Sequence, residues 1–118
     1  MSMAAQRDEI PPGTLEVLIL NTLARGGQMH GFAIADSILE NSEEVLRVEE
    51  GSLYPALQRM LLKDWIAGEW SKTDENRRAR YYRLTAEGRR QLARELERYH
   101  RVARAVGLVL APARGRTT

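Results

Sequence analysis

The chain has 118 residues, of which 18 are lysine or arginine and 16 are aspartate or glutamate, giving a formal net charge of +2. This length predicts one domain with a modest core, which a chain of this size often completes by forming an oligomer. Cysteine is absent from the sequence, which excludes disulfides and thiolate chemistry. No apolar run approaches the roughly 20 residues that span a bilayer. We therefore expect a cytoplasmic protein that makes no membrane contact.

Charge is distributed unevenly along the chain. Met1 to Trp70 holds 5 basic and 11 acidic residues, whereas Ser71 to Thr118 holds 13 basic and 5 acidic residues. A localised excess of positive charge is typical of a protein with a polyanionic partner such as nucleic acid. It is also typical of a solvated helix surface rich in arginine, so charge alone leaves both interpretations open.

Two helices are predicted in the first third of the chain. A polar leader over residues 1–12 precedes Thr14, which is placed to cap the first helix. This helix is apolar nearly all round, as expected of a buried helix, and Gly26-Gly27 ends it. His30-Gly31 opens a second helix that ends near Asn41-Ser42, and His30 is expected to cap it rather than bind a metal. The predicted inward side chains of the second helix are Phe32, Ala35, Ile38 and Leu39.

A short strand and a third helix follow. Val45 to Val48 is predicted to be the strand. The helix runs from Gly51-Ser52 to Lys63, with Ser52 as a candidate cap and Pro55 in its first turn, where proline is tolerated. Its core stripe, at the spacing of one helix face, is Leu53, Leu57, Met60 and Leu61. The remaining surface of this helix presents Ser52, Tyr54, Pro55, Gln58 and Arg59.

A β-hairpin, which we call the wing, is predicted next. Trp65-Ile66 begins its first strand, residues 73–76 form a polar turn, and Ala79 to Leu84 returns with Tyr82 in the core. Basic side chains on a protruding hairpin are suited to phosphate contacts and to insertion into a minor groove. They also prevent strand-to-strand association at a sheet edge, which explains one or two charges more readily than a cluster. The basic residues of the wing are Lys72, Arg77, Arg78, Arg80 and Arg83.

The last helix, residues 86–110, is predicted to begin at Thr85 as its cap, and residues 111–118 are predicted to form a flexible tail. Apolar residues recur along this helix at spacings of four and three, which is a heptad seam. We expect the seam to pair with a second copy of the chain. The alternative is that the helix folds back as a fourth core helix of its own domain. The seam residues are Leu92, Leu96, Tyr99, Ala103, Val106 and Leu110.

Catalysis has little support in the sequence. The two histidines, His30 and His100, lie far apart, and nothing pairs a serine with either of them as nucleophile and base. A glycine-rich phosphate loop is also missing from the sequence. We therefore expect a protein that is not an enzyme and that uses no metal or other cofactor.

Several segments together resemble the PadR-like transcriptional regulators, in their short form with a single C-terminal helix. The resemblance covers about residues 12–106. The matching segments are Gly13-Thr14-Leu15-Glu16, His30-Gly31-Phe32-Ala33-Ile34, Glu50-Gly51-Ser52-Leu53-Tyr54-Pro55-Ala56-Leu57, Asp64-Trp65-Ile66 and Arg80-Tyr81-Tyr82-Arg83-Leu84-Thr85-Ala86-Glu87-Gly88. Glu69-Trp70 and Asn76-Arg77-Arg78-Ala79 are similar to a branch often associated with permease genes. Glycine is usual at the position of Asp64, so a non-glycine residue must make the bend there.

The predicted fold is mainly α-helical with a small β-wing, in the order α-α-β-α-β-β-α. The resemblance makes residues 13–85 a winged helix-turn-helix DNA-binding domain and residues 86–110 a dimerisation helix. It implies a homodimeric, sequence-specific repressor, often released by a small-molecule effector. Its own or neighbouring genes, transport-related genes among them, would be its targets. By motif position, it assigns DNA contacts to Ser52, Tyr54, Pro55, Gln58 and Arg59, with wing contacts from the arginines.

The partners expected from this assignment are double-stranded DNA with a palindromic operator, a second copy of the chain and a small-molecule effector. The protein is expected to associate with the nucleoid. A different function class remains open at this point. The acidic N-terminal half and Glu49-Glu50, just before the third helix, would repel phosphates that faced them. They favour a winged-helix module that binds another protein and never contacts DNA.

Overall fold

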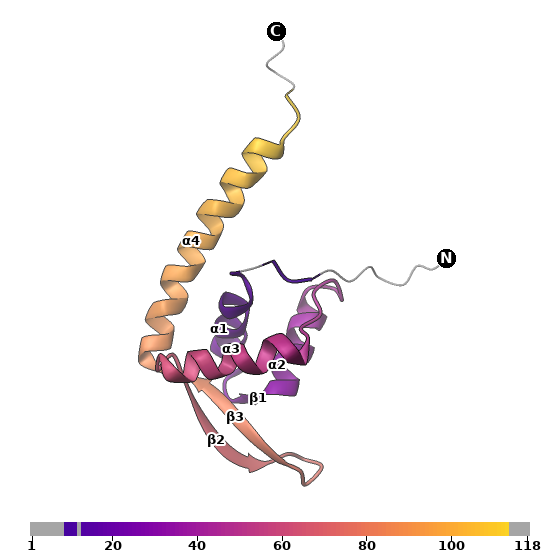
Figure 1. Cartoon of the computed structure of the whole chain (residues 1–118), viewed down its shortest axis with the longest axis vertical. Helices are drawn as coiled ribbons and strands as arrows, with labels where there is room; N and C mark the ends of the chain where they lie inside the picture. Colours follow the sequence, from indigo (N-terminus) through magenta and orange to yellow (C-terminus); the bar gives the residue numbers. More distant parts are fainter. Residues whose placement is uncertain (1–8, 12, 114–118) are drawn as a thin grey trace, which may run out of the picture.

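The computed structural model describes residues 9–11 and 13–113, so most of the predicted leader and residues 114–118 of the predicted tail lie outside the described residues. The described elements are α1 (Leu15–Gly26), β1 (Met29–His30), α2 (Gly31–Asn41), α3 (Glu50–Leu62), β2 (Ile66–Lys72), β3 (Arg78–Leu84) and α4 (Ala86–Leu110). The first three helices form a compact body, from which the β2–β3 hairpin and α4 project in opposite directions (Figure 1). The mainly helical fold with a small β-wing is thus confirmed.

One strand lies elsewhere than predicted. The antiparallel sheet has the order β1-β3-β2, and Met29–His30 pairs with Tyr82 and Tyr81 of β3. Val45 to Val48 forms no strand, so the prediction there is wrong. Leu46 and Val48 pack partly against the core while Val45 is exposed, which gives the segment a strand-like alternation. That alternation arises because the segment lines the core, outside the sheet.

The core is built on α1, as its all-round apolar pattern predicts. Its buried residues are Val17, Ile19, Leu20 and Leu23. In α2 the buried face is formed by Gly31, Ile34 and Ile38, and the predicted burial of Phe32 is wrong because this side chain is 65% exposed. His30 caps α2 as expected, since its Nδ1 accepts a hydrogen bond from the Ala33 N–H at 3.2 Å.

Helix α3 begins at Glu50, one residue before the predicted opening at Gly51-Ser52. Glu49 is its N-cap, so Ser52 lies inside the first turn and is not the cap, and Pro55 lies in the second turn. Because proline has no N–H, the Gly51 carbonyl receives no helical hydrogen bond from it. The core side of α3 agrees with the prediction and consists of Leu53, Ala56, Leu57 and Met60.

The end of α3 is made by a non-glycine residue, as the sequence requires. Asp64 has a φ of 62°, in the left-handed region. Its N–H donates to the Leu61 carbonyl at 3.1 Å, and the Trp65 N–H donates to the Met60 carbonyl at 3.0 Å. This pair of bonds is the Schellman arrangement, which ends a helix and redirects the chain. The chain therefore turns directly from α3 into β2.

The base of the hairpin is tied to the start of α4. Ile66, Tyr82 and Leu84 are buried, and Tyr82 is a core residue as predicted. Thr85 caps α4, because its Oγ1 accepts a hydrogen bond from the Gly88 N–H at 2.9 Å. The Thr85 N–H donates to the Trp65 carbonyl at 3.1 Å. These contacts set the direction in which α4 leaves the body.

Candidate nucleic-acid interface

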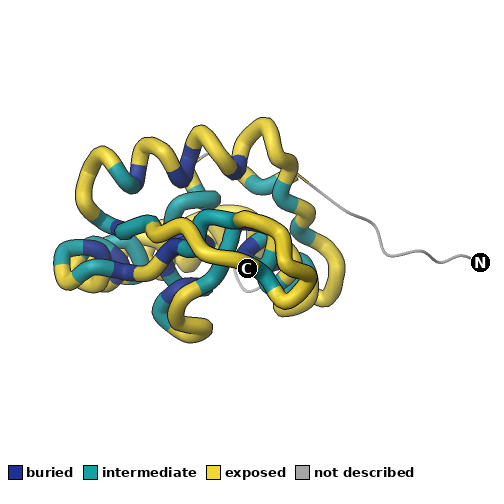
Figure 2. The backbone as a smooth tube through the Cα atoms, turned by 90° about the horizontal axis from the view of Figure 1, so that it is seen from below, coloured by how far each residue is buried: buried dark blue, intermediate teal, exposed yellow. Residues whose placement is uncertain are grey.

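The outward side of α3 carries all five side chains predicted to contact DNA on this helix. Figure 2 shows the buried positions of α3 on the side of the helix that faces the body and the exposed positions on its outer side. At 3.6 residues per turn, Gln58 lies close to the middle of the exposed side. Ser52, Tyr54, Pro55 and Arg59 are also exposed, to either side of it.

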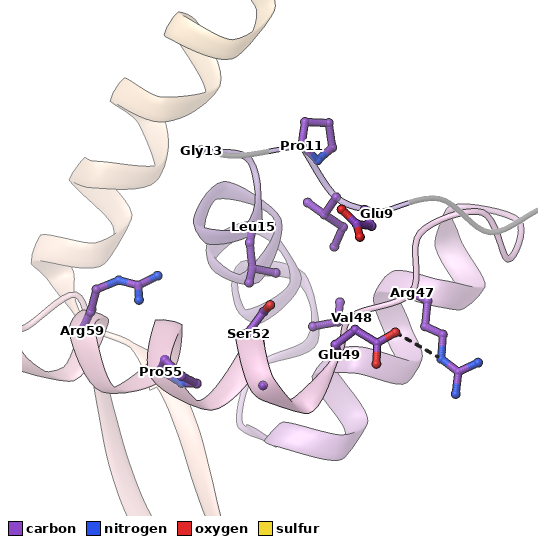
Figure 3. Close-up of a pocket in the computed structure, with 12 residues that line it drawn as sticks. Glu9, Pro11, Gly13, Leu15, Arg47, Val48, Glu49, Ser52, Pro55 and Arg59 are labelled. Carbon is purple, nitrogen blue, oxygen red and sulfur yellow. Dashed lines mark ion pairs between the residues drawn. The ribbon is translucent and has the colours of Figure 1, made fainter.

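Three of these residues face a hollow toward the N-terminal side of the body. Ser52, Pro55 and Arg59 follow one another at spacings of three and four and point from α3 toward the segment around Pro11 and Gly13 (Figure 3). The hollow has a volume of about 720 Å³. The Arg59 Nε also lies 3.1 Å from a carboxylate oxygen of Glu16 on α1. Arg59 therefore links α3 to α1 in addition to presenting a cation.

Tyr54 faces a second hollow, on the opposite side of α3. Its ring lies against Gly31 at the start of α2, where an added Cβ would come within 2.8 Å of the Tyr54 hydroxyl. This hollow, which we call the wing groove, has a volume of about 1000 Å³ and runs from α2 and the start of α3 to the hairpin. Arg77, Arg78 and Arg80 line its far wall. Tyr54 and three basic residues of the wing, Arg77, Arg78 and Arg80, thus border one concave surface.

The wing has the polar turn and the return strand that were predicted. At its tip the Thr73 N–H donates to the Arg77 carbonyl at 2.8 Å, and Asn76 adopts a left-handed φ of 64°. Lys72 pairs with Arg78 across the two strands, and Trp70 pairs with Arg80. The side chains of Lys72, Arg77 and Arg78 are exposed, whereas Arg80 is half-buried.

Two side chains that the sequence did not assign to the interface belong to this surface. Leu62 is 78% exposed and lies four residues after Gln58, on the same side of α3. Trp70 is 56% exposed on the wall of the wing groove, with the Arg78 guanidinium 4.6 Å from its ring centroid. The four-residue spacing from Gln58 and the two-residue strand alternation would have revealed both positions.

Acidic side chains surround the start of α3. Glu50 and Asp36 line the wing groove, and Glu49 lines the hollow on the other side. These carboxylates repel phosphates near the helix start, whereas the wing attracts them. A phosphate would therefore be repelled near the start of α3 and attracted by the basic side chains of the wing.

In the structure, the predicted seam of α4 has a part that packs on the protomer's own core and a part that is exposed. Leu92 is buried in the core of the protomer itself, and Leu96 packs against that core. Beyond them the helix projects, and its exposed large apolar side chains include several that the seam had omitted. The exposed members of the seam are Tyr99, Ala103, Val106 and Leu110, and the additional exposed residues are Val102, Leu108 and Val109.

Two groups in and beside this region have shifted pKa values. Burial raises the pKa of the Tyr82 hydroxyl above its ordinary value of 10.0, against a smaller opposing effect of Arg80. The hydrogen bond from Arg90 to Glu87, at 2.7 Å, lowers the pKa of that carboxyl below its ordinary value of 4.5. Neither group is placed for proton transfer. Within the described part of the chain, moreover, no set of three acidic or histidine side chains could hold a metal ion, and no helix is both long and apolar enough to cross a membrane.

Comparison with known proteins places the chain in a family. The model of the transcriptional regulator PadR-like family matches residues 19–94. A transcriptional regulator from Clostridium thermocellum shares the fold with a TM-score of 0.76 and 23% identity, over 84% of this chain and 95% of that one. A PadR family transcription regulator from Clostridium difficile is 27% identical with a TM-score of 0.70, over 84% and 100% of the two chains.

A PadR family transcriptional regulator from Eggerthella lenta is 28% identical, with a TM-score of 0.70, over 90% of this chain and 85% of that one. The family model spans more than half of the chain, and the winged arrangement of α3 and the β2–β3 hairpin is the one that these regulators share. The protein therefore belongs to the PadR-like family of transcriptional regulators, and it is a DNA-binding regulator and not an enzyme.

Proposed function

We propose that the protein is a homodimeric repressor that binds a palindromic operator through α3 and the wing. The observation that carries the proposal is the wing groove, in which Tyr54 of α3 and the wing arginines Arg77, Arg78 and Arg80 border one concave surface. A helix that enters a major groove places the adjacent hairpin over a phosphate backbone. The two elements then contact one duplex together.

In this arrangement α3 reads the bases. The major groove is about 12 Å wide and admits one helix, and glutamine pairs with the edge of adenine through two hydrogen bonds. Gln58, near the middle of the exposed side, is the residue best placed for such a contact. Ser52, Tyr54 and Pro55 contact the groove walls on either side of it. Arg59 contacts a phosphate once the duplex competes with Glu16 for its guanidinium.

The wing supplies the phosphate contacts. Lys72, Arg77 and Arg78 are exposed at the far end of the hairpin, and no carboxylate within 4.0 Å neutralises them among the described residues. Contacts of this kind fix the register of a protein on DNA without reading its sequence. Arg80, nearer the body and half-buried, contributes at the inner edge of the same wall.

The projecting part of α4 forms the dimer. Tyr99, Val102, Val106 and Val109 follow at spacings of three, four and three, and their side chains are between 45% and 82% exposed in the single protomer. Exposure of such a stripe to water is unfavourable, and packing against a second copy buries it and lowers the free energy. Two protomers related by a two-fold axis would present two copies of α3 to half-sites about 34–36 Å apart.

A dimer bound over a promoter blocks access of RNA polymerase, so repression of its own or neighbouring genes follows from the binding mode. The proposed targets include transport-related genes. The proposed signal that releases the repressor from DNA is a small-molecule effector. Such a repressor acts in the cytoplasm, on the nucleoid.

The test is a gel shift of the full chain against DNA from upstream of its own gene, with unrelated DNA as competitor. We expect a specific shift that weakens steeply with salt, because each phosphate contact contributes about 0.9 to the slope of log K against log salt. Failure to shift any sequence, or a shift unaffected by salt, would refute the proposal. Gln58→Ala should reduce the preference for one base step while leaving binding to non-specific DNA unchanged.

A further inference from the structure

The inner face of the wing contains one exposed aromatic ring, that of Trp70, among its basic side chains. Along β2 the residues on this face are Ile66, Gly68, Trp70 and Lys72. Gly68 and Trp70 pair with Tyr82 and Arg80 of β3. Arg78 follows on the same face, two residues from Arg80. Trp70 is 56% exposed and is not among the described residues that form the core or pack against it. A large exposed indole in this position requires an explanation other than stability of the fold.

The ring lies under two of the three arginines of β3, Arg78 and Arg80. The guanidinium carbon of Arg78 is 4.6 Å from the ring centroid, and that of Arg80 is 5.9 Å from it. Both distances are within the roughly 6 Å over which a cation is attracted to the face of an aromatic ring. Stacking on indole holds a planar guanidinium in a fixed orientation, which suits arginine better than lysine.

No stronger interaction holds these two arginines. Among the described residues neither one forms an ion pair. The Nε of Arg80 is shielded from solvent and has no hydrogen-bond partner in the described part of the chain. It passes over Gly68, where an added Cβ would come within 2.6 Å of that nitrogen. Packing against Gly68 and Trp70 is therefore what places the Arg80 side chain.

We propose that Trp70 is a positioning residue for DNA binding, which orients Arg78 and Arg80 toward the phosphate backbone without contacting DNA itself. This inference rests on the proposed function, because it concerns how the wing prepares its phosphate contacts. A flexible arginine loses conformational freedom when it binds a phosphate, and a side chain already held in place loses less. Gly68 acts with Trp70 by leaving room for the Arg80 guanidinium group.

The experiment compares Trp70→Leu and Trp70→Phe in the full chain by fluorescence anisotropy on operator DNA. Leucine keeps an apolar side chain but removes the ring, and we expect it to weaken binding by about 2- to 5-fold for each arginine that it releases. Phenylalanine keeps a ring face and should recover most of the loss. Ser71→Ala, on the opposite face of the same strand, is the matched control and should bind like the wild type.

A double-mutant cycle separates positioning from direct contact. If Trp70 acts through the arginines, Trp70→Leu has no further effect in a chain that already carries Arg78→Ala and Arg80→Ala. An equal loss in that background, or no loss in the wild-type background, would overturn the inference. If the wild type does not bind DNA at all, or binds with an affinity that is independent of salt, the proposed function is refuted instead.

Gly68→Ala provides a second variant that leaves the indole in place. Its Cβ displaces the Arg80 guanidinium group, so we expect a loss of affinity that disappears when Arg80 is alanine. Thermal melting checks that each variant is folded. If Trp70→Leu does not fold, the outcome of Gly68→Ala decides the inference: a loss that persists in the Arg80→Ala background contradicts it.

Discussion

The carbonyl oxygen of Trp65 lies against the α-carbon of Gly88, so closely that no β-carbon fits between them. This contact joins the base of the wing to the first turn of α4, beside the hydrogen bonds of Thr85 to the Trp65 carbonyl and to the Gly88 N–H. The wing meets DNA and α4 carries the dimer in our account. The contact between Trp65 and Gly88 is therefore where the two functions are held in a fixed relation.

Replacing Gly88 with alanine tests this junction. The added methyl group overlaps a backbone atom that cannot rotate away, so we expect unfolding free energy to fall by about 1–3 kcal/mol. Urea denaturation followed by circular dichroism measures the change. Gly107→Ala on the same helix is the control, because its Cβ would have nothing within 4 Å. There alanine should raise stability by up to about 1 kcal/mol, and equal effects at both sites would contradict the account.

The burial of Tyr82 predicts a loss of stability in alkaline solution. Because the pKa of its hydroxyl is raised in the folded state, the folded chain holds the proton more tightly than the unfolded chain. The contribution is complete below the ordinary pKa of 10.0 and is lost as the pH rises from there through the folded value. Unfolding free energies measured from pH 8 to 11 should show this decline.

The Tyr82→Phe variant should show a smaller alkaline decline, since it has no hydroxyl to ionise. Tyr81→Phe retains Tyr82 and serves as the control, because Tyr81 lies on the other face of β3. An identical decline in the wild type and in Tyr82→Phe would show that burial of this hydroxyl does not link folding to pH.

The dimer is tested on the part of α4 that the protomer leaves exposed. Val106 is 50% exposed, so Val106→Asp should keep the protomer folded while it places a charge in the dimer contact. We expect sedimentation to show a shift from dimer toward monomer. Leu108→Asp is the matched control, because Leu108 is also exposed and lies roughly 200° around the helix from Val106. A dimer that survives Val106→Asp would contradict the seam.

The wing is tested by two arginines on opposite faces of β3. Arg78 faces the wing groove, whereas Arg83 pairs with Ala67 on the outer face. Arg78→Ala should lower the salt slope of DNA binding by about one and weaken all sequences alike. Arg83→Ala should change neither the slope nor the affinity. If Arg78→Ala and Arg83→Ala have the same effect, DNA is attracted by the general positive charge of the protein and not by specific contacts with the wing groove.

Local sequence signals predicted much of the fold. Caps at His30 and Thr85 follow from side chains that bond a few residues away, and the positions of the helices and the hairpin follow from apolar spacing. The same signals gave the wrong result where two faces of one element compete. Phe32 has the right spacing for a buried residue, but Gly31, Ile34 and Ile38 form the face that meets the core.

The candidate site depended more on contacts between distant residues, which a sequence does not reveal. Arg59 was predicted to contact DNA, and nothing in the sequence indicated that Glu16, 43 residues away, pairs with it. Leu92 was assigned to the seam, but the protomer buries it in its own core. The pairing of Trp70 with Arg80 depends on the hairpin register, which only the structure gives. Local chemistry thus identified the surface, and tertiary packing decided which side chains remain available on it.

The central claim is that two copies of α3 and two wings bind one operator. Hydroxyl-radical footprinting of the wild-type dimer on its own upstream DNA tests this most directly. The account predicts two protected half-sites related by a two-fold axis, with centres about 10–10.5 base pairs apart or a multiple of that spacing. A single protected half-site, or protection that unrelated DNA removes as readily as operator DNA, would contradict it.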